Sequence, residues 1–281
     1  MKFKFLILFY CFSINIFSQN IELIESFIGY QEESEIISFT PNNRIILSGD
    51  YSGKLNLWDL KHQTIIKSIY AHSRPINSIK FSENGKKFTT SSSDSCVKIW
   101  DFNSGRLIDS IKIQSIPQIA IFNKNENGYL IFDEDGNVFE KKFRNKKLTK
   151  KFTNEQKYLD AILSHDKNYI ITCDEKSLKM KDYYSGDLTW EIEHPSKNIF
   201  SKVQIHSKDT LVLWSNNGNI NFWEIENKNP LLEINATNLH NRLSINRHCD
   251  IIISGYYKDR PFLINLNEID FSEDYKTDFV I

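Results

Sequence analysis

Short apolar runs with alternating polar positions recur along most of the chain. Residues 47–60 read LSGDYSGKLNLWDL and residues 89–102 read TTSSSDSCVKIWDF, and in both the alternation ends in Trp-Asp, at Trp58 and Trp100. An alternation of period two is typical of a β-strand that buries one face, and clusters of Gly, Asp, Asn and Ser between such runs indicate hairpin turns. The pattern therefore predicts antiparallel β-sheet.

The same frame recurs six times at a nearly constant interval. We call the position that Trp58 and Trp100 occupy in this frame the marker. The markers of the six units fall at residues 58, 100, 141, 181, 223 and 264, so the successive gaps are 42, 41, 40, 42 and 41 residues. The predicted strands of a unit are denoted a, b, c and d, and strand c carries the marker; the last unit lacks an obvious d strand in register. The a strands are predicted at residues 36–39, 76–81, 119–122, 161–163, 203–205 and 243–245. Four strands in about 40 residues is the repeat length of a β-propeller blade.

The repeat resembles the WD40 family over residues 21–266. This resemblance implies an all-β fold, a WD40-type β-propeller of six four-stranded antiparallel blades, with seven blades, one of them incomplete, as the alternative. Residues 21–28 are similar to the d strand of the first unit, which implies that the N-terminal strand completes the last blade and removes an exposed sheet edge. The predicted domains are a signal peptide (1–19), the propeller (20–266) and a C-terminal tail (267–281).

The resemblance also implies a buried polar network. In WD40 repeats a His before strand a, a Ser or Thr on strand b, an Asp in the b–c turn and the Trp of strand c are joined by hydrogen bonds. The second unit has residues of these types at the matching places, and the first unit has Tyr30 where the His would stand. Such a network satisfies buried polar groups and fixes turn geometry, so its predicted role is structural. The predicted members are His72, Ser92, Asp94 and Trp100.

The first residues differ from the rest of the chain. Lys2 and Lys4 precede an apolar run at residues 5–17, and the small Ser18 follows. This order is typical of a secretory signal peptide, and the apolar run is too short to span a bilayer. No later stretch is long and apolar enough to do so. We therefore expect a bacterial protein exported to the periplasm or the extracellular space, without a transmembrane segment in the mature chain.

Catalytic motifs are absent from the sequence. There is no G-x-S-x-G, no phosphate loop and no H-E-x-x-H, and the seven histidines are scattered. We expect no enzyme, no cofactor and no metal. The alternative is a propeller hydrolase or lactonase, which would require acids, amides and histidines to converge on the mouth of the central channel.

A basic stretch, KKFRNKKLTKK at residues 141–151, contains seven Lys or Arg residues and no acid. One interpretation is a site for an anionic envelope ligand. The other is a solvated c–d turn and outer strand, where lysines discourage edge pairing. The net charge of the whole chain is −1, so no global field attracts nucleic acid, and export argues against that ligand too.

The predicted function is a scaffold that binds a protein or peptide. The position seven residues before each marker is expected in the b–c turn, on one face of the ring. There the first and last units carry tyrosine and the opposing units carry acids, and Tyr and Arg are frequent in interface hot spots. The predicted partner-binding residues are Tyr30, Tyr51, Glu134, Asp174, Tyr256, Tyr257 and Arg260.

Overall fold

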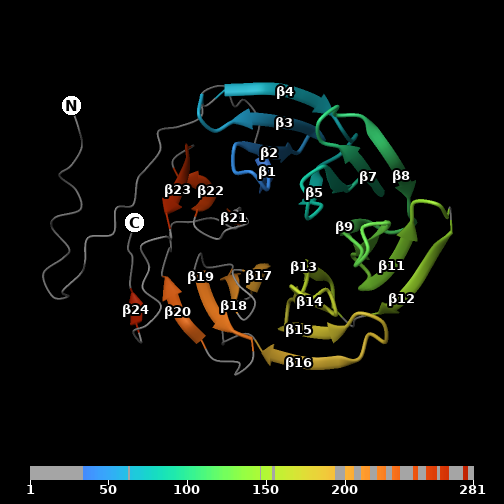
Figure 1. Cartoon of the computed structure of the whole chain (residues 1–281), viewed down its shortest axis with the longest axis vertical. Coiled ribbons are helices and arrows are strands. Elements are labelled where there is room, and N and C mark those ends of the chain that lie inside the picture. Colours follow the sequence, from blue (N-terminus) through green and yellow to red (C-terminus); the bar gives the residue numbers. More distant parts are fainter. Residues whose placement is uncertain are drawn as a thin grey trace, which may run out of the picture.

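Six sheets stand in a ring around a common axis (Figure 1). The computed structural model describes residues 34–62, 64–145, 147–153, 156–193, 200–205, 210–215, 220–225, 230–234, 243–245, 251–257, 260–265 and 275–277. Five of the sheets contain four successive antiparallel strands, with the first strand nearest the axis and the fourth at the rim. The molecule is therefore a β-propeller, and the predicted fold class is confirmed.

The strands follow the predicted a, b, c, d order. The first two sheets are β1 (Ser34–Phe39), β2 (Ile45–Asp50), β3 (Lys54–Asp59) and β4 (Thr64–Tyr70), then β5 (Ile76–Phe81), β6 (Lys87–Ser92), β7 (Cys96–Asp101) and β8 (Leu107–Lys112). The next two are β9 (Pro117–Phe122), β10 (Gly128–Asp133), β11 (Asn137–Lys142) and β12 (Leu148–Thr153), then β13 (Tyr158–Leu163), β14 (Tyr169–Asp174), β15 (Ser177–Asp182) and β16 (Leu188–Glu193). The fifth contains β17 (Phe200–Ile205), β18 (Thr210–Ser215), β19 (Ile220–Glu224) and β20 (Pro230–Ile234), and the sixth β21 (Leu243–Ile245), β22 (Ile251–Tyr257) and β23 (Arg260–Asn265). All six markers lie on the c strands, β3, β7, β11, β15, β19 and β23.

The ring closes between the first and the sixth sheets, because β1 lies against β21 and β22. The predicted closing strand, residues 21–28, and the predicted signal peptide, residues 1–19, lie outside the described residues. Within the predicted tail, β24 (Tyr275–Thr277) pairs in parallel with β20, so the fifth sheet gains a fifth strand at its outer edge.

Hydrophobic side chains pack between neighbouring sheets, so the core is a series of clusters around the ring. Leu47 and Leu55 of the first sheet meet Ile76 and Phe88 of the second, and equivalent clusters join the second to the third, the third to the fourth and the fourth to the fifth sheets. Each blade buries its faces only against its neighbours, which is why the repeat is stable as a ring and not as a single unit.

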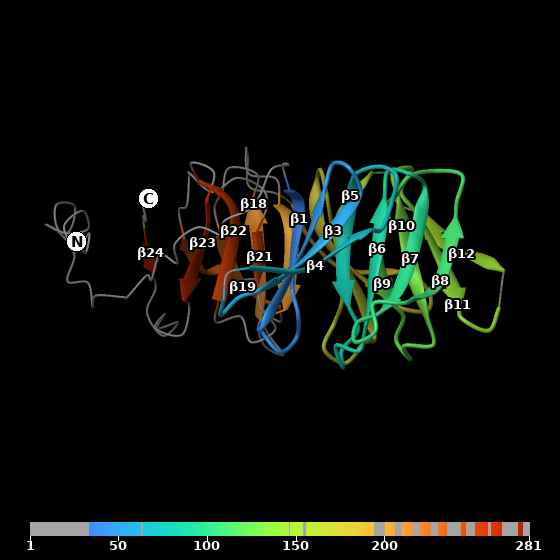
Figure 2. The same ribbon diagram turned by 90° about the horizontal axis from the view of Figure 1, so that it is seen from above.

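Antiparallel order divides the turns between the two faces of the disc (Figure 2). The a–b and c–d turns lie on one face, which we call the a–b face. The b–c turns and the d–a loops lie on the other, which we call the b–c face. Any site built from turns therefore belongs to one of these two faces.

Candidate functional site

The buried polar network of the second sheet lies beneath the b–c face. The ring nitrogen Nδ1 of His72 lies 3.0 Å from a carboxylate oxygen of Asp94, and Nε2 lies 2.7 Å from the hydroxyl of Thr90. The indole Nε1 of Trp100 donates to the same Thr90 hydroxyl at 3.0 Å. Burial lowers the pKa of His72 to about 4, although Asp94 opposes this shift, so the imidazole is neutral at pH 7. The chain of donors runs from Trp100 through Thr90 and His72 to Asp94.

Ser92, which the sequence pattern placed in this network, lies beside it. Its hydroxyl donates to the carbonyl of Arg74 at 3.0 Å and accepts the backbone N–H of Asp94 at 3.1 Å. Strand alternation explains the difference. Thr90 and Ser92 are two residues apart and point to the same face of β6, but Phe88 pairs with Trp100, which brings Thr90 within reach of the indole. The linking residue is therefore Thr90.

Asp94 is held by several donors. Its carboxylate accepts the backbone N–H groups of Ser73 at 3.1 Å and Cys96 at 2.9 Å, in addition to His72. Burial raises the pKa of Asp94, but these hydrogen bonds and the attraction of His72 outweigh burial and lower it. The first sheet repeats part of the arrangement, since Trp58 Nε1 donates to Ser48 Oγ at 2.9 Å. All these groups bond to one another, which fits a structural role.

On the b–c face, the predicted partner-binding residues differ in exposure. Tyr51 is 43% exposed on the β2–β3 turn. Glu134 is exposed on the β10–β11 turn, where its carboxylate accepts the N–H of Ile116 at 3.2 Å. Of Tyr256, Tyr257 and Arg260 the structure describes the backbone, which pairs Tyr257 with Arg260 across the β22–β23 hairpin, and Tyr30 lies outside the described residues.

Asp174 is not available to a partner. It is buried, its Oδ1 accepts the N–H groups of Lys176 and Ser177, and its Oδ2 forms an ion pair with Lys179 at 2.8 Å. The reason is the length of the turn. Three residues join the strands at 51–53, 93–95 and 134–136, but only two, 175–176, join β14 to β15. Counting back seven from the marker therefore ends on the last residue of strand b, and Glu175 is the exposed equivalent of Tyr51.

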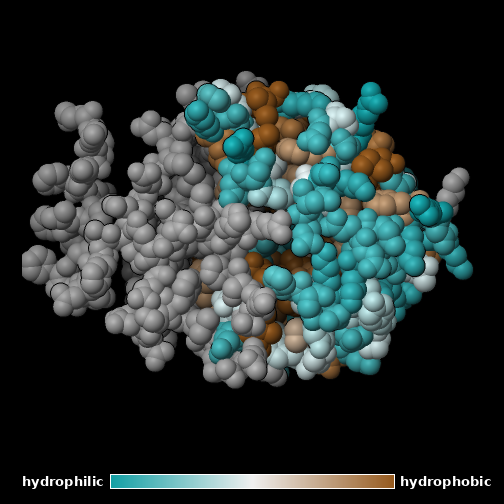
Figure 3. Space-filling view, viewed as in Figure 1, coloured by the Kyte–Doolittle hydropathy of each residue, from teal (hydrophilic) through white to brown (hydrophobic). Residues whose placement is uncertain are grey.

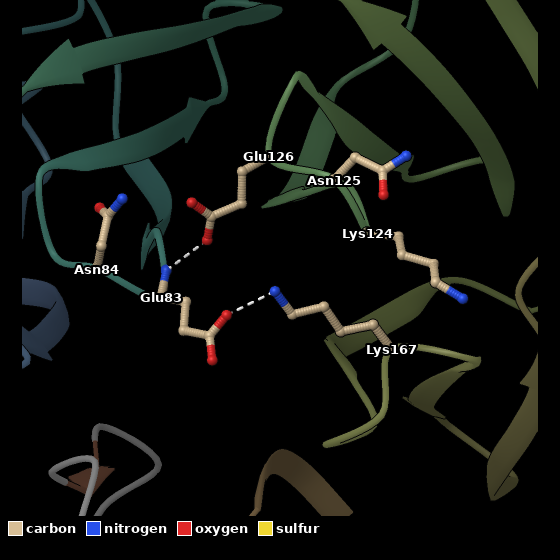
Figure 4. A pocket seen from close by; sticks show the side chains of 6 residues that line it. All are labelled: Glu83, Asn84, Lys124, Asn125, Glu126 and Lys167. Carbon is tan, nitrogen blue, oxygen red and sulfur yellow. Dashed lines mark hydrogen bonds and ion pairs between the residues drawn. The ribbon is translucent and has the colours of Figure 1, made fainter.

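A shallow pocket opens on the a–b face, between the a–b turns of the second, third and fourth sheets (Figure 4). Lys167 Nζ lies 2.5 Å from Glu83 Oε2, and Glu126 Oε1 accepts the N–H of Glu83 at 2.7 Å. Glu126 and Lys167 have positive φ angles of 51° and 58°, at the turn position where the second sheet has Gly85. A left-handed backbone is unfavourable for such residues, so both turns keep a strained geometry beside the contacts that join the three blades. The pocket is lined by Glu83, Asn84, Lys124, Asn125, Glu126 and Lys167.

A second charged cluster links a strands near the axis. Lys80 Nζ of β5 lies 2.6 Å from Asp160 Oδ1 of β13, and Asp160 Oδ2 accepts the N–H of Val203 at 3.2 Å. Burial raises the pKa of Asp160, but attraction by Lys80 and Lys202 outweighs it and lowers that pKa. Burial lowers the pKa of Lys202, and Asp160 opposes that shift. One carboxylate thus ties the second, fourth and fifth sheets together.

The basic stretch divides into buried and exposed cations. Lys141 is buried, its ammonium pairs with Asp109 and it lies 5.4 Å from the ring centroid of Tyr129. Lys151 Nζ lies 4.5 Å from the ring centroid of Tyr183. The exposed cations are Lys142, Arg144, Lys147 and Lys150.

The described part of the chain contains neither a cluster of metal ligands nor a membrane-spanning helix. No group of three His, Cys, Asp or Glu side chains there could hold a metal ion. None of its segments forms a helix long and apolar enough to cross a membrane. The acids at the a–b mouth, Glu83 and Glu126, bond to Lys167 and to backbone N–H as described above.

The ring of repeats and its Trp-centred hydrogen bonds define a WD40-type β-propeller. The family model WD40, described as "WD domain, G-beta repeat", matches residues 24–59 and 63–101. The fold is similar to the solved β-propeller domain of Myceliophteria thermophila Cps50 (Swd1), with a TM-score of 0.66 and 12% identity over 88% of this chain and 86% of that chain. The chain therefore contains WD40 repeats at residues 24–59 and 63–101 and has the fold of a β-propeller.

Curated relatives match parts of the chain. Human pre-mRNA-processing factor 17 is 22% identical over 189 residues, which is 65% of this chain and 31% of that protein. The non-catalytic subunit wdr4 of the Dictyostelium discoideum tRNA (guanine-N(7)-)-methyltransferase is 32% identical over 126 residues, 43% of this chain and 25% of that protein. Retinoblastoma-binding-like protein E of the same organism is 31% identical over 97 residues, 34% of this chain and 18% of that protein. The matches span less than a third of these relatives.

The predicted export and periplasmic or extracellular location are wrong. The curated relatives that match come from eukaryotes such as Homo sapiens, Saccharomyces cerevisiae, Candida albicans and Dictyostelium discoideum, and among them are factors named for pre-mRNA processing, polyadenylation and tRNA methylation. The prediction depended on a short apolar run after two lysines, and such a run does not by itself distinguish a targeting segment from an apolar strand. The argument from export against a nucleic-acid ligand therefore no longer holds.

Proposed function

We propose that this protein is a non-catalytic scaffold that binds a protein or peptide partner through its b–c face. The main support is the rigid presentation of Tyr51. The carbonyl of Gly53 in the same turn accepts the N–H groups of Ala71 at 3.1 Å and His72 at 3.0 Å. Gly53 has a φ of 83°, and a Cβ there would lie 2.3 Å from the carbonyl oxygen of His72, so the turn depends on glycine. An anchor already held in place loses little conformational entropy when a partner binds.

Arg74 adds a second anchor beside Tyr51. It is exposed in the d–a loop that holds the β2–β3 turn, and a Cβ on Gly53 would lie 2.8 Å from its carbonyl oxygen. Tyr and Arg offer a large contact area with polar tips, which is why they dominate interface hot spots. The neighbouring sixth sheet carries Tyr257 and Arg260 at the corresponding end of β22 and β23. We assign these four residues to the partner-binding surface, with Glu134 at its acidic side and Tyr30 and Tyr256 as further members.

The class of partner is inferred from the relatives. One is named as a non-catalytic subunit of a methyltransferase and another as a retinoblastoma-binding protein homologue. A scaffold that holds another subunit needs no catalytic groups of its own, since function depends on the site and not on the fold. We propose that this protein likewise acts as a non-catalytic subunit of a protein assembly.

Site-specific photocrosslinking tests the proposal. A photoreactive phenylalanine analogue placed at Tyr51 should crosslink a discrete protein partner in cells. The matched control is the same analogue at Tyr184, which is 70% exposed on the a–b face. Tyr51→Ala should then weaken binding of the purified partner at an unchanged melting temperature. Equal protein crosslinking from both positions, or undiminished binding by Tyr51→Ala, would show that the b–c face is not the interface.

A further inference from the structure

Cations and aromatic rings lie together on the a–b face of the third and fourth sheets and on the adjoining outer strand β12. Each of the five cation–π contacts among the described residues includes a residue of the segment between Lys124 and Phe152. Figure 3 shows mostly hydrophilic side chains over the third sheet. We call the cation–aromatic strip the exposed residues Lys142, Arg144, Lys147, Lys150 and Tyr184, together with the half-buried Lys124.

The strip is continuous between the two sheets. Lys151 Nζ lies 4.5 Å from the ring centroid of Tyr183, and the rings of Tyr183 and Tyr184 meet edge to face with centroids 5.2 Å apart. Lys124 Nζ lies 5.2 Å from the ring centroid of Tyr184. Gly186, in the same turn as Tyr184, approaches Phe152 of β12 so closely that a Cβ would lie 2.8 Å from its ring. The basic strand and the aromatic turn are therefore one surface.

The four cations at positions 142, 144, 147 and 150 are available to a ligand. All are exposed, and none forms an ion pair with another described residue. Asp182 of the neighbouring turn is occupied, since its carboxylate accepts the N–H groups of Tyr184 and Ser185 at 2.8 Å. The excess of positive charge is local, because the whole chain has a net charge of −1. A local cationic surface of this kind attracts a polyanion.

The aromatic ring decides which polyanion fits. Tyr184 is 70% exposed, although burying an aromatic ring against its neighbours would be favourable. Acidic peptides gain little from such a ring, whereas the unstacked bases of a single strand stack on aromatic side chains while cations track the phosphates. We propose that the cation–aromatic strip binds single-stranded nucleic acid, with phosphates on the cations and a base on Tyr184. The strip lies on the face opposite Tyr51, so nucleic acid and a protein partner can bind together.

Fluorescence anisotropy with a labelled oligouridylate of about 12 nucleotides tests this inference on the full chain. Four phosphate contacts predict that log K falls with log salt with a slope of about −3. The variant Lys142→Gln/Arg144→Gln/Lys147→Gln/Lys150→Gln should abolish binding. Tyr184→Ala should weaken it about tenfold, and Tyr184→Trp should restore it.

The matched control neutralises three lysines and one arginine elsewhere. Arg44, Lys61, Lys67 and Lys112 are exposed on the first two sheets. Their joint change to Gln alters the total charge equally and should leave most of the affinity intact. Equal losses in the two quadruple variants would mean non-specific attraction and overturn the inference. So would oligoglutamate binding as tightly as oligouridylate, or unchanged affinity in Tyr184→Ala, because either result indicates an acidic polypeptide as the ligand.

Discussion

Replacement of Asp94 by Ala tests the physical role of the network beneath the b–c face. The carboxylate accepts two backbone N–H groups and the Nδ1–H of His72, and the His72 side chain is fully buried. After the replacement, water can reach the N–H of Ser73, which is exposed, but not the imidazole. A buried donor left without a partner costs about 1–3 kcal/mol. For a protein of this length, 2 kcal/mol corresponds to a fall in melting temperature of about 4–8 °C.

Differential scanning calorimetry at pH 7 measures this fall. The control is Asp101→Ala in the same sheet, because that carboxylate is exposed and accepts the N–H and hydroxyl of Ser104 in the c–d turn. Asp101→Ala should shift the melting temperature less. Equal melting of Asp94→Ala and the wild type would refute the view that the buried imidazole depends on Asp94.

Three further predictions concern buried polar groups. Thr90→Val should lower the free energy of unfolding more than Ser92→Ala in urea titrations, because Thr90 joins His72 to Trp100 while Ser92 lies outside the relay. The pKa of His72 is lowered from 6.5 to about 4. The stability that the neutral imidazole of His72 contributes is therefore present above pH 6.5 and is lost as the pH falls toward 4. In urea titrations, the free energy of unfolding should depend less on pH for His72→Gln than for the wild type. Asp160→Asn should cost about 3 kcal/mol in the same assay, because two lysines then face each other without a counter-charge, and equal stability to the wild type would contradict this account of the cluster.

The spacing of the repeats in the sequence predicted the fold correctly, but it assigned some side chains to the wrong surface or network position. A repeat of 40–42 residues places every marker on a c strand, because each blade repeats the a, b, c order of strands around the ring. Assigning a side chain to a site requires the register within each hairpin. The turn at 175–176 is one residue shorter than the b–c turns of the first three sheets, so counting back from the marker gave the buried Asp174 and not an exposed turn residue. Thr90 was missed for a similar reason, since two hydroxyl residues on one face of β6 look alike until the partner of Phe88 is known. A comparison of b–c turn lengths in the sequence could have identified Glu175.

The repeat spacing also did not show the environment of the lysines that replace tryptophan at the third and fourth markers. In the first two sheets the marker indole is buried and its N–H donates to a hydroxyl on strand b. Lys141 is buried at the equivalent position in a similar way: its aliphatic stem packs in the core, and its ammonium pairs with Asp109. Its neighbour Lys142 points to the opposite face of β11 and is exposed.

Substitution of these two adjacent lysines should therefore affect different properties: stability for Lys141 and nucleic-acid binding for Lys142. Lys141→Gln should lower the melting temperature, because it removes the partner of Asp109 and the cation beside Tyr129, and should leave the salt dependence of oligouridylate binding unchanged. Lys142→Gln should melt like the wild type and make the slope of log K against log salt less steep by about 0.7, the value expected for one lost phosphate contact. Both measurements use the same two purified variants. If Lys142→Gln destabilises the protein and Lys141→Gln reduces the slope, the register of β11 assigns the two side chains to the wrong faces. The proposed binding surface of Lys142, Arg144, Lys147 and Lys150 would then be wrong.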